Sequence, residues 1–298
     1  MERMSECRIC PRDCARNRCQ GETGFCGETN QIRIARAALH FWEEPFISGE
    51  KGSGAIFFTG CNLKCIYCQN AQIALSSQGK VVSARELAEI MLDLQAQGAH
   101  NINLVTPSHV VLQIREALQL ARASGLSLPV VYNTSAYENA ETLRLLEGLV
   151  DIYLPDFKYM DSELAAKYSH APDYPEVARK AIAEMYRQRG AFVHGADGML
   201  QSGVVVRHLL LPLGVRNAKA VLDELRETYG ENIYISIMNQ FTPVRKIDAY
   251  PHLNRKVTKR EYEKVLSYIL EKGMEHVFFQ EGETAKESFI PDFNQFCE

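Results

Sequence analysis

Three cysteines at a fixed, short spacing are the residues of this chain best suited to do chemistry. Cys61, Cys65 and Cys68 form a C-x3-C-x2-C pattern, which nine cysteines in 298 residues would produce by chance with a probability of roughly 1%. Three thiolates are one fewer than a structural zinc site takes, whereas a cubane iron–sulfur cluster held by three thiolates leaves one iron free for another ligand. The pattern therefore predicts an open iron–sulfur site.

The first 30 residues hold a second group of cysteines. Four of them can form a closed site, and their spacing suits tetrahedral zinc and a second iron–sulfur cluster equally well. Cys19 lies inside the same segment and could replace one of the four, whereas Cys297, near the end of the chain, is expected to be a bystander. The four expected ligands are Cys7, Cys10, Cys14 and Cys26.

The composition is that of a folded protein with no nucleic-acid or membrane partner. The chain has 46% hydrophobic and 23% charged residues, and its formal net charge of −4 gives no basic field for phosphates. No run of about 18 apolar residues occurs, and the start of the chain lacks the apolar segment of a signal peptide. We therefore expect a cytoplasmic protein, in which clustered thiols stay reduced and bind metal rather than form disulfides.

Short apolar strands alternate with helices through most of the chain, which predicts βαβ units and a parallel sheet. The first strand, at 54–58, leads into the loop of Cys61, so the motif follows the carboxyl end of a strand. We expect a partial or full (β/α) barrel over residues 51–290, with a Cys-rich extension (1–50) before it and a tail (291–298) after it. The expected strands are 54–58, 101–105, 129–133, 150–154, 203–212, 232–238 and 276–280, and the expected helices are 84–97, 110–124, 140–147, 175–188, 218–229 and 259–271.

Polar side chains lie at or just after the ends of most of these strands. The carboxyl ends of parallel strands meet at one mouth, so these side chains should converge there. Any one of them could instead form a turn or a helix cap, because Ser, Thr, Asn and Asp favour both. Their recurrence from strand to strand favours a site for a polar ligand. They are Thr106, Ser108, Asn133, Ser135, Asp156, Lys158, Arg207 and Gln240.

The cysteine motif and its surroundings resemble a known family. CNLKCIYC, with Tyr67 before the last cysteine, is similar to the signature of the radical S-adenosylmethionine (SAM) enzymes, and ARAALHFWEEPFISG, GSGAIFFTGCNLKCIYCQN, INLVTPSH and VVVRHLLLP resemble the PflX-type homologues of pyruvate formate-lyase activating enzymes. The resemblance implies a radical SAM barrel in which Cys61, Cys65 and Cys68 hold three irons of a [4Fe-4S] cluster. The fourth iron would bind SAM, and an electron from the reduced cluster would cleave SAM to a 5′-deoxyadenosyl radical.

The same resemblance implies which residues bind SAM. The Gly-Gly-Glu segment usual in these enzymes is replaced here by a segment in which the hydroxyls of Thr106 and Ser108 would hold the amino group. Asp156 and Lys158 match a D-x-K pair whose lysine lies near the cofactor carboxylate, and they are the expected catalytic pair. The alternative for this pair is a salt bridge with no catalytic part. Further cofactor contacts are implied for Tyr67, Asn70, Asn133, Ser135 and Gln240.

Arg207 and His208 are neighbours on one expected strand, so their side chains point to opposite faces and only one can face the interior. By the resemblance, Arg207 approaches the cofactor, and His208 is then a hydrogen-bonded residue of the helix layer. The segment Trp42-Glu43-Glu44 ahead of the barrel is either a lid that faces the substrate or a packed linker with solvated carboxylates.

The expected function is abstraction of a hydrogen atom by the adenosyl radical. The resemblance implies that this activates a glycyl radical enzyme, with an electron donor such as flavodoxin or ferredoxin as a second partner. Radical chemistry on a small molecule, a peptide or another protein substrate is the alternative among enzymes. From another class, the chain could be a non-catalytic iron–sulfur or zinc protein that transfers electrons or binds a partner.

Overall fold

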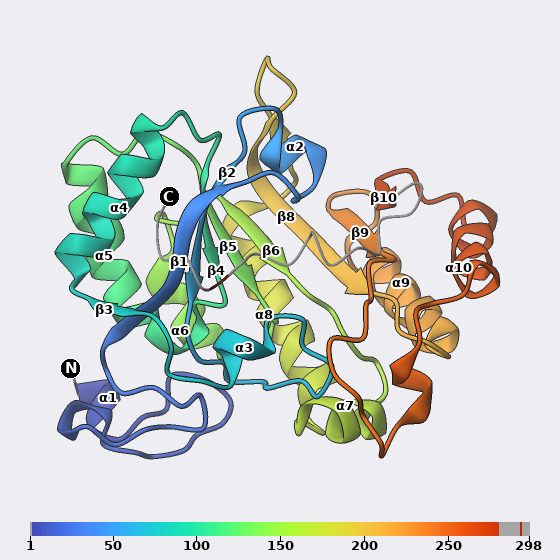
Figure 1. The fold of residues 1–298 in the computed structure, drawn as a ribbon. Coiled ribbons are helices and arrows are strands. Elements are labelled where there is room, and N and C mark those ends of the chain that lie inside the picture. Colours follow the sequence, from blue (N-terminus) through green and yellow to red (C-terminus); the bar gives the residue numbers. More distant parts are fainter. Residues whose placement is uncertain (1, 280–292, 294–298) are drawn as a thin grey trace.

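The computed structural model describes residues 2–279 and residue 293, which form a mixed sheet flanked by helices (Figure 1). The expected tail, 291–298, lies outside the described residues except for Phe293. Cys297 and residues 280–290 of the expected barrel lie outside them too. No helix in the described part of the chain is long and apolar enough to cross a membrane.

Seven parallel strands make up most of the sheet, and they confirm the seven strands predicted from the apolar runs. Each parallel strand lies beside the one that precedes it in the chain. The side chains of β2, β4 and β6 are buried on both faces, which explains why these segments are continuous apolar runs, whereas β10 is half-buried to exposed. The strands are β2 (Ser53–Phe58), β4 (Ile102–Val105), β5 (Val130–Thr134), β6 (Ile152–Pro155), β8 (Leu200–Leu209), β9 (Tyr234–Met238) and β10 (Val277–Phe279).

Three further strands are antiparallel and were not predicted. β1 (Ile32–His40) pairs with both β2 and β3 (Lys80–Val82), and β7 (Val193–His194) forms a hairpin with β8. The sheet order is β10-β9-β8-β6-β5-β4-β2-β1-β3, so within the described residues the structure is an open, partial barrel. β1 lies within the segment 1–50 and belongs to the sheet, because it pairs with β2.

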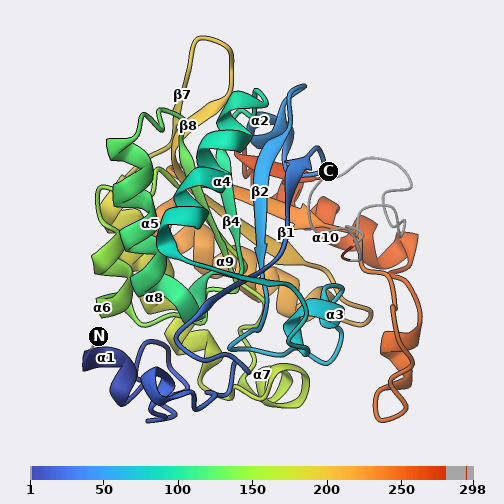
Figure 2. The same ribbon diagram turned by 60° about the vertical axis from the view of Figure 1, so that its left-hand side comes forward.

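Helices cover the outer face of the sheet (Figures 1 and 2). The predicted helices are confirmed with shifts of a few residues, except that 140–147 contains a shorter α-helix followed by a 3-10 turn. Within the described residues, helix α7 and three short helices, α1 (Glu2–Ser5), α2 (Pro45–Ser48) and α3 (Ala71–Ala74), were not predicted. The helices are α4 (Ala84–Ala96), α5 (Val111–Ala123), α6 (Ala140–Leu143) with η3 (Arg144–Leu146), α7 (Ser162–Ser169), α8 (Tyr174–Arg189), α9 (Val215–Tyr229) and α10 (Lys259–Glu271).

The inner face of the sheet is filled at one end by a short helix. Helix α2 (Pro45–Ser48) lies in the connection between β1 and β2, and its Ile47 is fully buried against side chains of β5, β6 and β8. These strands alternate, so Val131 and Ile152 face α2, whereas Tyr132 and Tyr153 face the helix layer. Helix α2 thus closes the inner face at the end where the parallel strands begin (Figure 1).

The Cys-rich extension packs at the other end, where the parallel strands finish (Figures 1 and 2). It is mostly irregular, with α1 (Glu2–Ser5) and the 3-10 turn η1 (Arg18–Gln20). The Thr142 hydroxyl donates to the Ile9 carbonyl at 2.7 Å, which ties the extension to α6. The remaining short elements are α3 (Ala71–Ala74), η2 (Ser108–Val110) and η4 (Pro251–Asn254).

Candidate active site

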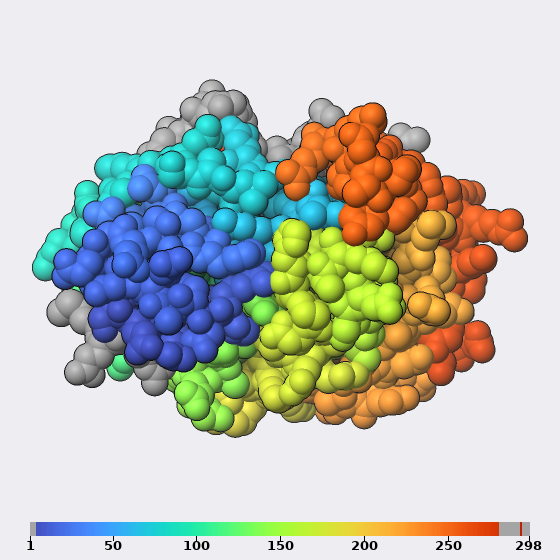
Figure 3. All heavy atoms as spheres, turned by 90° about the horizontal axis from the view of Figure 1, so that it is seen from below, coloured from blue at the N-terminus to red at the C-terminus, as the bar shows by residue number. Residues whose placement is uncertain are grey.

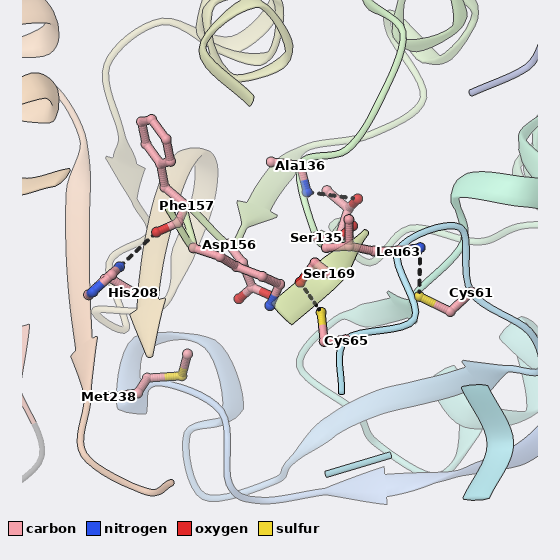
Figure 4. A network of polar contacts seen from close by, with 12 residues as sticks. Cys61, Leu63, Cys65, Ser135, Ala136, Asp156, Phe157, Ser169, His208 and Met238 are labelled. Carbon is pink, nitrogen blue, oxygen red and sulfur yellow. Dashed lines mark hydrogen bonds and ion pairs between the residues drawn. The ribbon is translucent and has the colours of Figure 1, made fainter. Parts of the chain in front are cut away.

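The loop that follows β2 carries the C-x3-C-x2-C motif at the carboxyl end of that strand, as predicted. Cys61 and Cys65 are buried, and Cys68 is partly exposed. The backbone N–H of Leu63 donates to Cys61 Sγ at 3.4 Å, and the Ser169 hydroxyl donates to Cys65 Sγ at 3.0 Å (Figure 4). Donors of this kind orient and stabilise thiolate ligands of a metal centre.

Burial keeps the thiols of Cys61 and Cys68 protonated when no metal is bound. It raises the pKa of Cys68 to about 12, and the nearby thiols of Cys65 and Cys61 add to the shift. Burial likewise raises the pKa of Cys61. Metal cations would favour the thiolate forms, and in a cluster each thiolate binds a different iron. Three thiols on one loop, with donors directed at their sulfurs, fit such a group.

A cavity of about 490 Å³ opens next to the cysteines, on the inner face of the sheet. The ends of β4, β5, β6, β8 and β9 all contribute side chains to its lining, so the expected convergence of polar groups is present. Of the predicted residues, those that line it are Cys61, Cys65, Tyr67, Cys68, Asn70, Thr106, Asn133, Ser135, Asp156, Lys158, Arg207 and Gln240. Ser108 and the N-terminal cysteines are not among them.

Asp156 and Lys158 form an ion pair in this cavity, just after β6, with Lys158 Nζ 2.5 Å from Asp156 Oδ2. Burial opposes the charge on Lys158, but Asp156 and Cys65 outweigh it, so the pKa of the lysine is raised well above its ordinary value. The Tyr174 hydroxyl accepts from the backbone N–H of Lys158 and donates to the Asp156 carbonyl at 2.7 Å. A buried tyrosine therefore fixes the backbone that carries the pair.

Arg207 and His208 point to opposite faces of β8, as the alternation of a strand requires. Arg207 lines the cavity, whereas His208 is buried on the other side. The His208 ring donates through Nδ1 to the Phe157 carbonyl at 2.7 Å (Figure 4). Burial lowers the pKa of His208 to about 4, so this ring is neutral and holds the backbone beside Asp156.

Two residues that the sequence analysis assigned to a lid or a solvated linker, Glu43 and Glu44, line the cavity, and their carboxylates are largely buried there. Arg207 donates through Nε to Glu44 Oε1 at 2.9 Å and also pairs with Glu43. Asn103 donates to Glu43 Oε1 at 2.8 Å. Burial alone would raise the pKa of Glu44, but Arg207 outweighs it and lowers that pKa. The neighbouring Trp42 lines the cavity and stays 52% exposed, so it lies at the rim.

Ser108 lies outside the cavity, contrary to the expectation that it holds the cofactor. The chain turns sharply at Thr106, with a φ of +60°, and the following 3-10 turn directs Ser108 into the protein interior. Its hydroxyl donates to Glu138 Oε1 at 2.5 Å, and the Thr134 hydroxyl donates to the same oxygen. Burial raises the pKa of Glu138 to about 7. No sequence motif indicated Glu138, because its partners come from two separate strand ends.

The four N-terminal cysteines expected to form a second site lie near one another. Burial raises the pKa of Cys10 to about 12, with the Cys26 and Cys7 thiols adding to the shift. The pKa of Cys26 is also raised by burial, with further contributions from Cys7 and Cys14. In neither cysteine group do three Cys, His, Asp or Glu side chains of the described residues converge as they would around a single metal ion.

The fold and the site define a class of protein. Residues 55–203, half of the chain, match the family model of the radical SAM superfamily, and the chain belongs to this superfamily. Its members are enzymes, and membership implies SAM and a [4Fe-4S] cluster as cofactors. The chain is also similar to the "Uncharacterized protein MJ0674" of Methanocaldococcus jannaschii, with 28% identity over 269 residues that cover 87% of this chain and 73% of the relative.

Solved structures share the fold at low sequence identity. SuiB of Streptococcus suis, bound to its precursor peptide SuiA, matches with a TM-score of 0.51 and 15% identity over 75% of this chain. The chain spans 47% of SuiB, about half of its length. A radical SAM methyltransferase from Sphaerobacter thermophilus matches with a TM-score of 0.52 and 12% identity, over 76% of this chain and 67% of the methyltransferase. At these identities the likeness establishes the fold alone.

Proposed function

We propose that this chain cleaves SAM reductively at a [4Fe-4S] cluster held by Cys61, Cys65 and Cys68, and that it uses the product radical to abstract a hydrogen atom. The observation that carries the proposal is the position of these thiols, which line a cavity together with an Asp–Lys pair and other polar groups from five strand ends. The cluster and SAM would supply the 5′-deoxyadenosyl radical.

The chain's own side chains would bind and orient SAM. Lys158 offers a buried cation for the carboxylate, and Asp156 fixes its position. Ser135 brings to the same cavity a buried hydroxyl oxygen that has no hydrogen-bond partner in the structure. A buried polar atom without a partner is costly, so a bound polar ligand would relieve it. The other proposed contacts are Tyr67, Asn70, Thr106, Asn133, Arg207 and Gln240.

We further propose a polypeptide as the hydrogen donor, with activation of a glycyl radical enzyme as the specific reaction and the PflX-type homologues as the subfamily. The rim of the cavity supports this, because Phe41 and Trp42 line the cavity and remain 49% and 52% exposed. Exposed aromatic side chains of this kind are typical of contacts with protein partners. Flavodoxin or ferredoxin would supply the electron.

The test is SAM cleavage by the anaerobically purified protein, reconstituted with iron and sulfide and reduced with dithionite. We expect 5′-deoxyadenosine to form with the wild type and not with Cys65→Ala, while Cys19→Ala serves as the matched control outside the motif. Equal product from wild type and Cys65→Ala, or none from either, would overturn the proposal and favour a binding or electron-transfer protein. The hydrogen donor is tested by supplying either a deuterated glycyl radical enzyme or a mixture of deuterated small molecules and measuring deuterium in the 5′-deoxyadenosine. Deuterium from the protein supports the proposal, and deuterium from the small molecules alone would overturn the polypeptide donor.

A further inference from the structure

The N-terminal cysteines lie close together, and glycine backbone packs against two of them. A β-carbon added to Gly24 would lie 3.2 Å from Cys14 Sγ and 3.5 Å from Cys26 Sγ, so the Gly24 backbone lies directly against these two sulfurs. Cys7, Cys10 and Cys26 are buried, and Cys14 is partly exposed. Backbone this close to the sulfurs belongs to the surroundings that orient and tune thiolate ligands of a metal centre.

A buried cation lies against these sulfurs. Arg18 is only 1% exposed, and its Nη1 donates to Cys7 Sγ at 3.6 Å and to the His109 carbonyl at 2.8 Å. Its other partners are the carbonyls of Glu28 and Thr29; the Glu28 carboxylate is near enough to interact with its charge, but no carboxylate of the described residues lies within ion-pair distance of it. A guanidinium is always charged, so its burial calls for a neighbouring anion. A centre held by four thiolates is such an anion.

The same cysteines touch the loop of the first site. The backbone N–H of Cys61 donates to the Cys26 carbonyl at 3.2 Å, so one residue of each group is joined by a direct hydrogen bond. Arg12, between Cys10 and Cys14, donates to the Asn62 carbonyl at 2.7 Å. The extension also forms part of the molecular surface (blue in Figure 3), whereas the cysteines of the first site lie inward beside the cavity.

We propose that Cys7, Cys10, Cys14 and Cys26 bind a second iron–sulfur cluster, of the [4Fe-4S] type, through which electrons reach the first. Its position between the surface and the Cys61 loop favours a cluster over zinc, because zinc carries no electron. Arg18 would stabilise the additional negative charge of the reduced cluster. One electron would pass from a reduced donor of the flavodoxin or ferredoxin class to this cluster and then to the first; the donor is oxidised by one electron, and no bond changes. Only the transfer to the first cluster rests on the proposed function.

The experiment compares the full-length wild type with a Cys61→Ala/Cys65→Ala/Cys68→Ala variant, both reconstituted anaerobically with iron, sulfide and zinc. The variant should keep about four irons per chain, against about eight in the wild type, and should give an electron paramagnetic resonance signal on reduction that SAM does not alter. Zinc without iron, or no metal at all, in this variant would overturn the second cluster. Loss of SAM cleavage by the wild type with the irons retained would overturn only the proposed function.

Two single variants test the ligand set and the contact between the sites. Cys14→Ser should lower the iron content by about half, and Cys19→Ser, in the same segment, should leave it unchanged. Iron loss in Cys19→Ser but not in Cys14→Ser would overturn the ligand assignment. The fully reduced wild type should show a broadened signal from spin coupling between the two clusters, absent from both Cys14→Ser and the triple variant. A wild-type spectrum equal to the sum of the two single-cluster spectra would overturn the proposed electron route.

Discussion

Lys158 Nζ lies 2.5 Å from Asp156 Oδ2, and both side chains lie at the end of β6 beside the cavity that the three motif cysteines line. The lysine is a permanent cation here, because the carboxylate raises its pKa well above the ordinary value despite burial. The pair is held from behind by Tyr174 and by His208 through the backbone of Phe157. The site therefore presents a positioned positive charge to any anionic ligand in the cavity.

Replacing this charge should weaken SAM binding. Lys158→Met removes the cation proposed for the SAM carboxylate, and a hydrogen bond to a charged group contributes about 1.5–3 kcal/mol, so the Kd for SAM should rise about 10- to 100-fold. Calorimetric titration of the reconstituted protein measures this. Lys180→Met is the matched control, because Lys180 pairs with Glu176 on the exposed surface of α8. Equal affinities in the two variants would contradict the prediction.

Replacing Arg207 should destabilise the fold. Arg207→Met leaves Glu43 and Glu44 buried without their cation, and breaking a buried ion pair in this way costs about 3–5 kcal/mol. Urea unfolding of the anaerobic protein measures the loss. The Trp42→Ala control removes an exposed neighbour and should change the free energy of unfolding by less than about 1 kcal/mol. A similar loss in both variants would show that the ion pairs are not the cause.

The parallel sheet was predictable because its strands are buried on both faces. Segments such as 102–105 and 152–155 lie between two packed layers, so each is a continuous apolar run, and glycines such as Gly98 end the preceding helices. The position of the cysteine motif and of the polar strand ends at one mouth was predictable from the parallel sheet, because parallel strands place their carboxyl ends together. β1 was not, because an antiparallel strand interrupted by Arg33 and Arg36 lacks that continuous apolar pattern.

The interactions that the sequence could not indicate join distant segments. Glu43 and Glu44 are charged residues in a connection, which ordinarily lies in solvent. Their pairing with Arg207 on β8, with a further hydrogen bond from Asn103 to Glu43, explains their burial. Ser108 was misplaced for a similar reason, because its spacing after β4 is right but a tight turn directs its side chain to Glu138. The spacing along the chain predicts that a residue lies near the mouth formed by the strand ends. The direction of its side chain depends on the local backbone conformation, which the spacing does not indicate.

The contact between the two cysteine groups depends on a glycine. Gly60 has a φ of +86°, and a β-carbon there would lie 2.8 Å from the Cys26 carbonyl oxygen. Gly98 has a similar φ of +91° with nothing within 4 Å, so it isolates the cost of the backbone conformation alone. We expect Gly98→Ala to cost about 1 kcal/mol and Gly60→Ala about 1–3 kcal/mol more, measured by urea unfolding. If Gly60→Ala and Gly98→Ala lower the free energy of unfolding equally, the Cys26 carbonyl can move away from residue 60 without cost, and the prediction is wrong.

The two serines after neighbouring strands should respond to mutation in opposite ways. Ser108→Ala removes a buried hydrogen bond to Glu138, so it should cost about 1 kcal/mol of stability and leave the Kd for SAM unchanged. Ser135→Ala removes a hydroxyl that lines the cavity and has no partner in the protein, so it should leave stability nearly unchanged and raise that Kd about 3- to 10-fold. Unfolding and titration of both variants test this, and the reverse pattern would return Ser108 to the binding site.

Glu138 makes the stability of the protein depend on pH near neutrality. Burial raises its pKa to about 7, although hydroxyls of Ser108, Thr134 and Tyr132 donate to its Oε1 and favour the ionised form. Its Oε2 is buried without a partner, so ionisation leaves part of the charge uncompensated. The folded pKa lies above the unfolded value of about 4.3, so the folded state holds the proton more tightly. The resulting stability is complete below about pH 4 and is lost as the pH rises through 7.

Glu138→Gln should remove this dependence. The amide keeps a carbonyl oxygen for the three hydroxyl donors and cannot ionise, so its contribution stays constant as the pH rises. Relative to Glu138→Gln, the wild type should lose on the order of 3 kcal/mol between pH 5 and pH 8. Urea unfolding of the anaerobic, metal-loaded proteins at intervals across this range measures the difference. Glu261→Gln serves as the control: Arg255 and Thr258 hold the pKa of Glu261 far below its ordinary value, so the free energy of this variant should stay parallel to the wild type over this range. If the free energy of unfolding of Glu138→Gln also stays parallel to that of the wild type, Glu138 does not titrate between pH 5 and pH 8. The prediction would then be wrong, and the ionised carboxylate would be stabilised by more than the three hydroxyl donors.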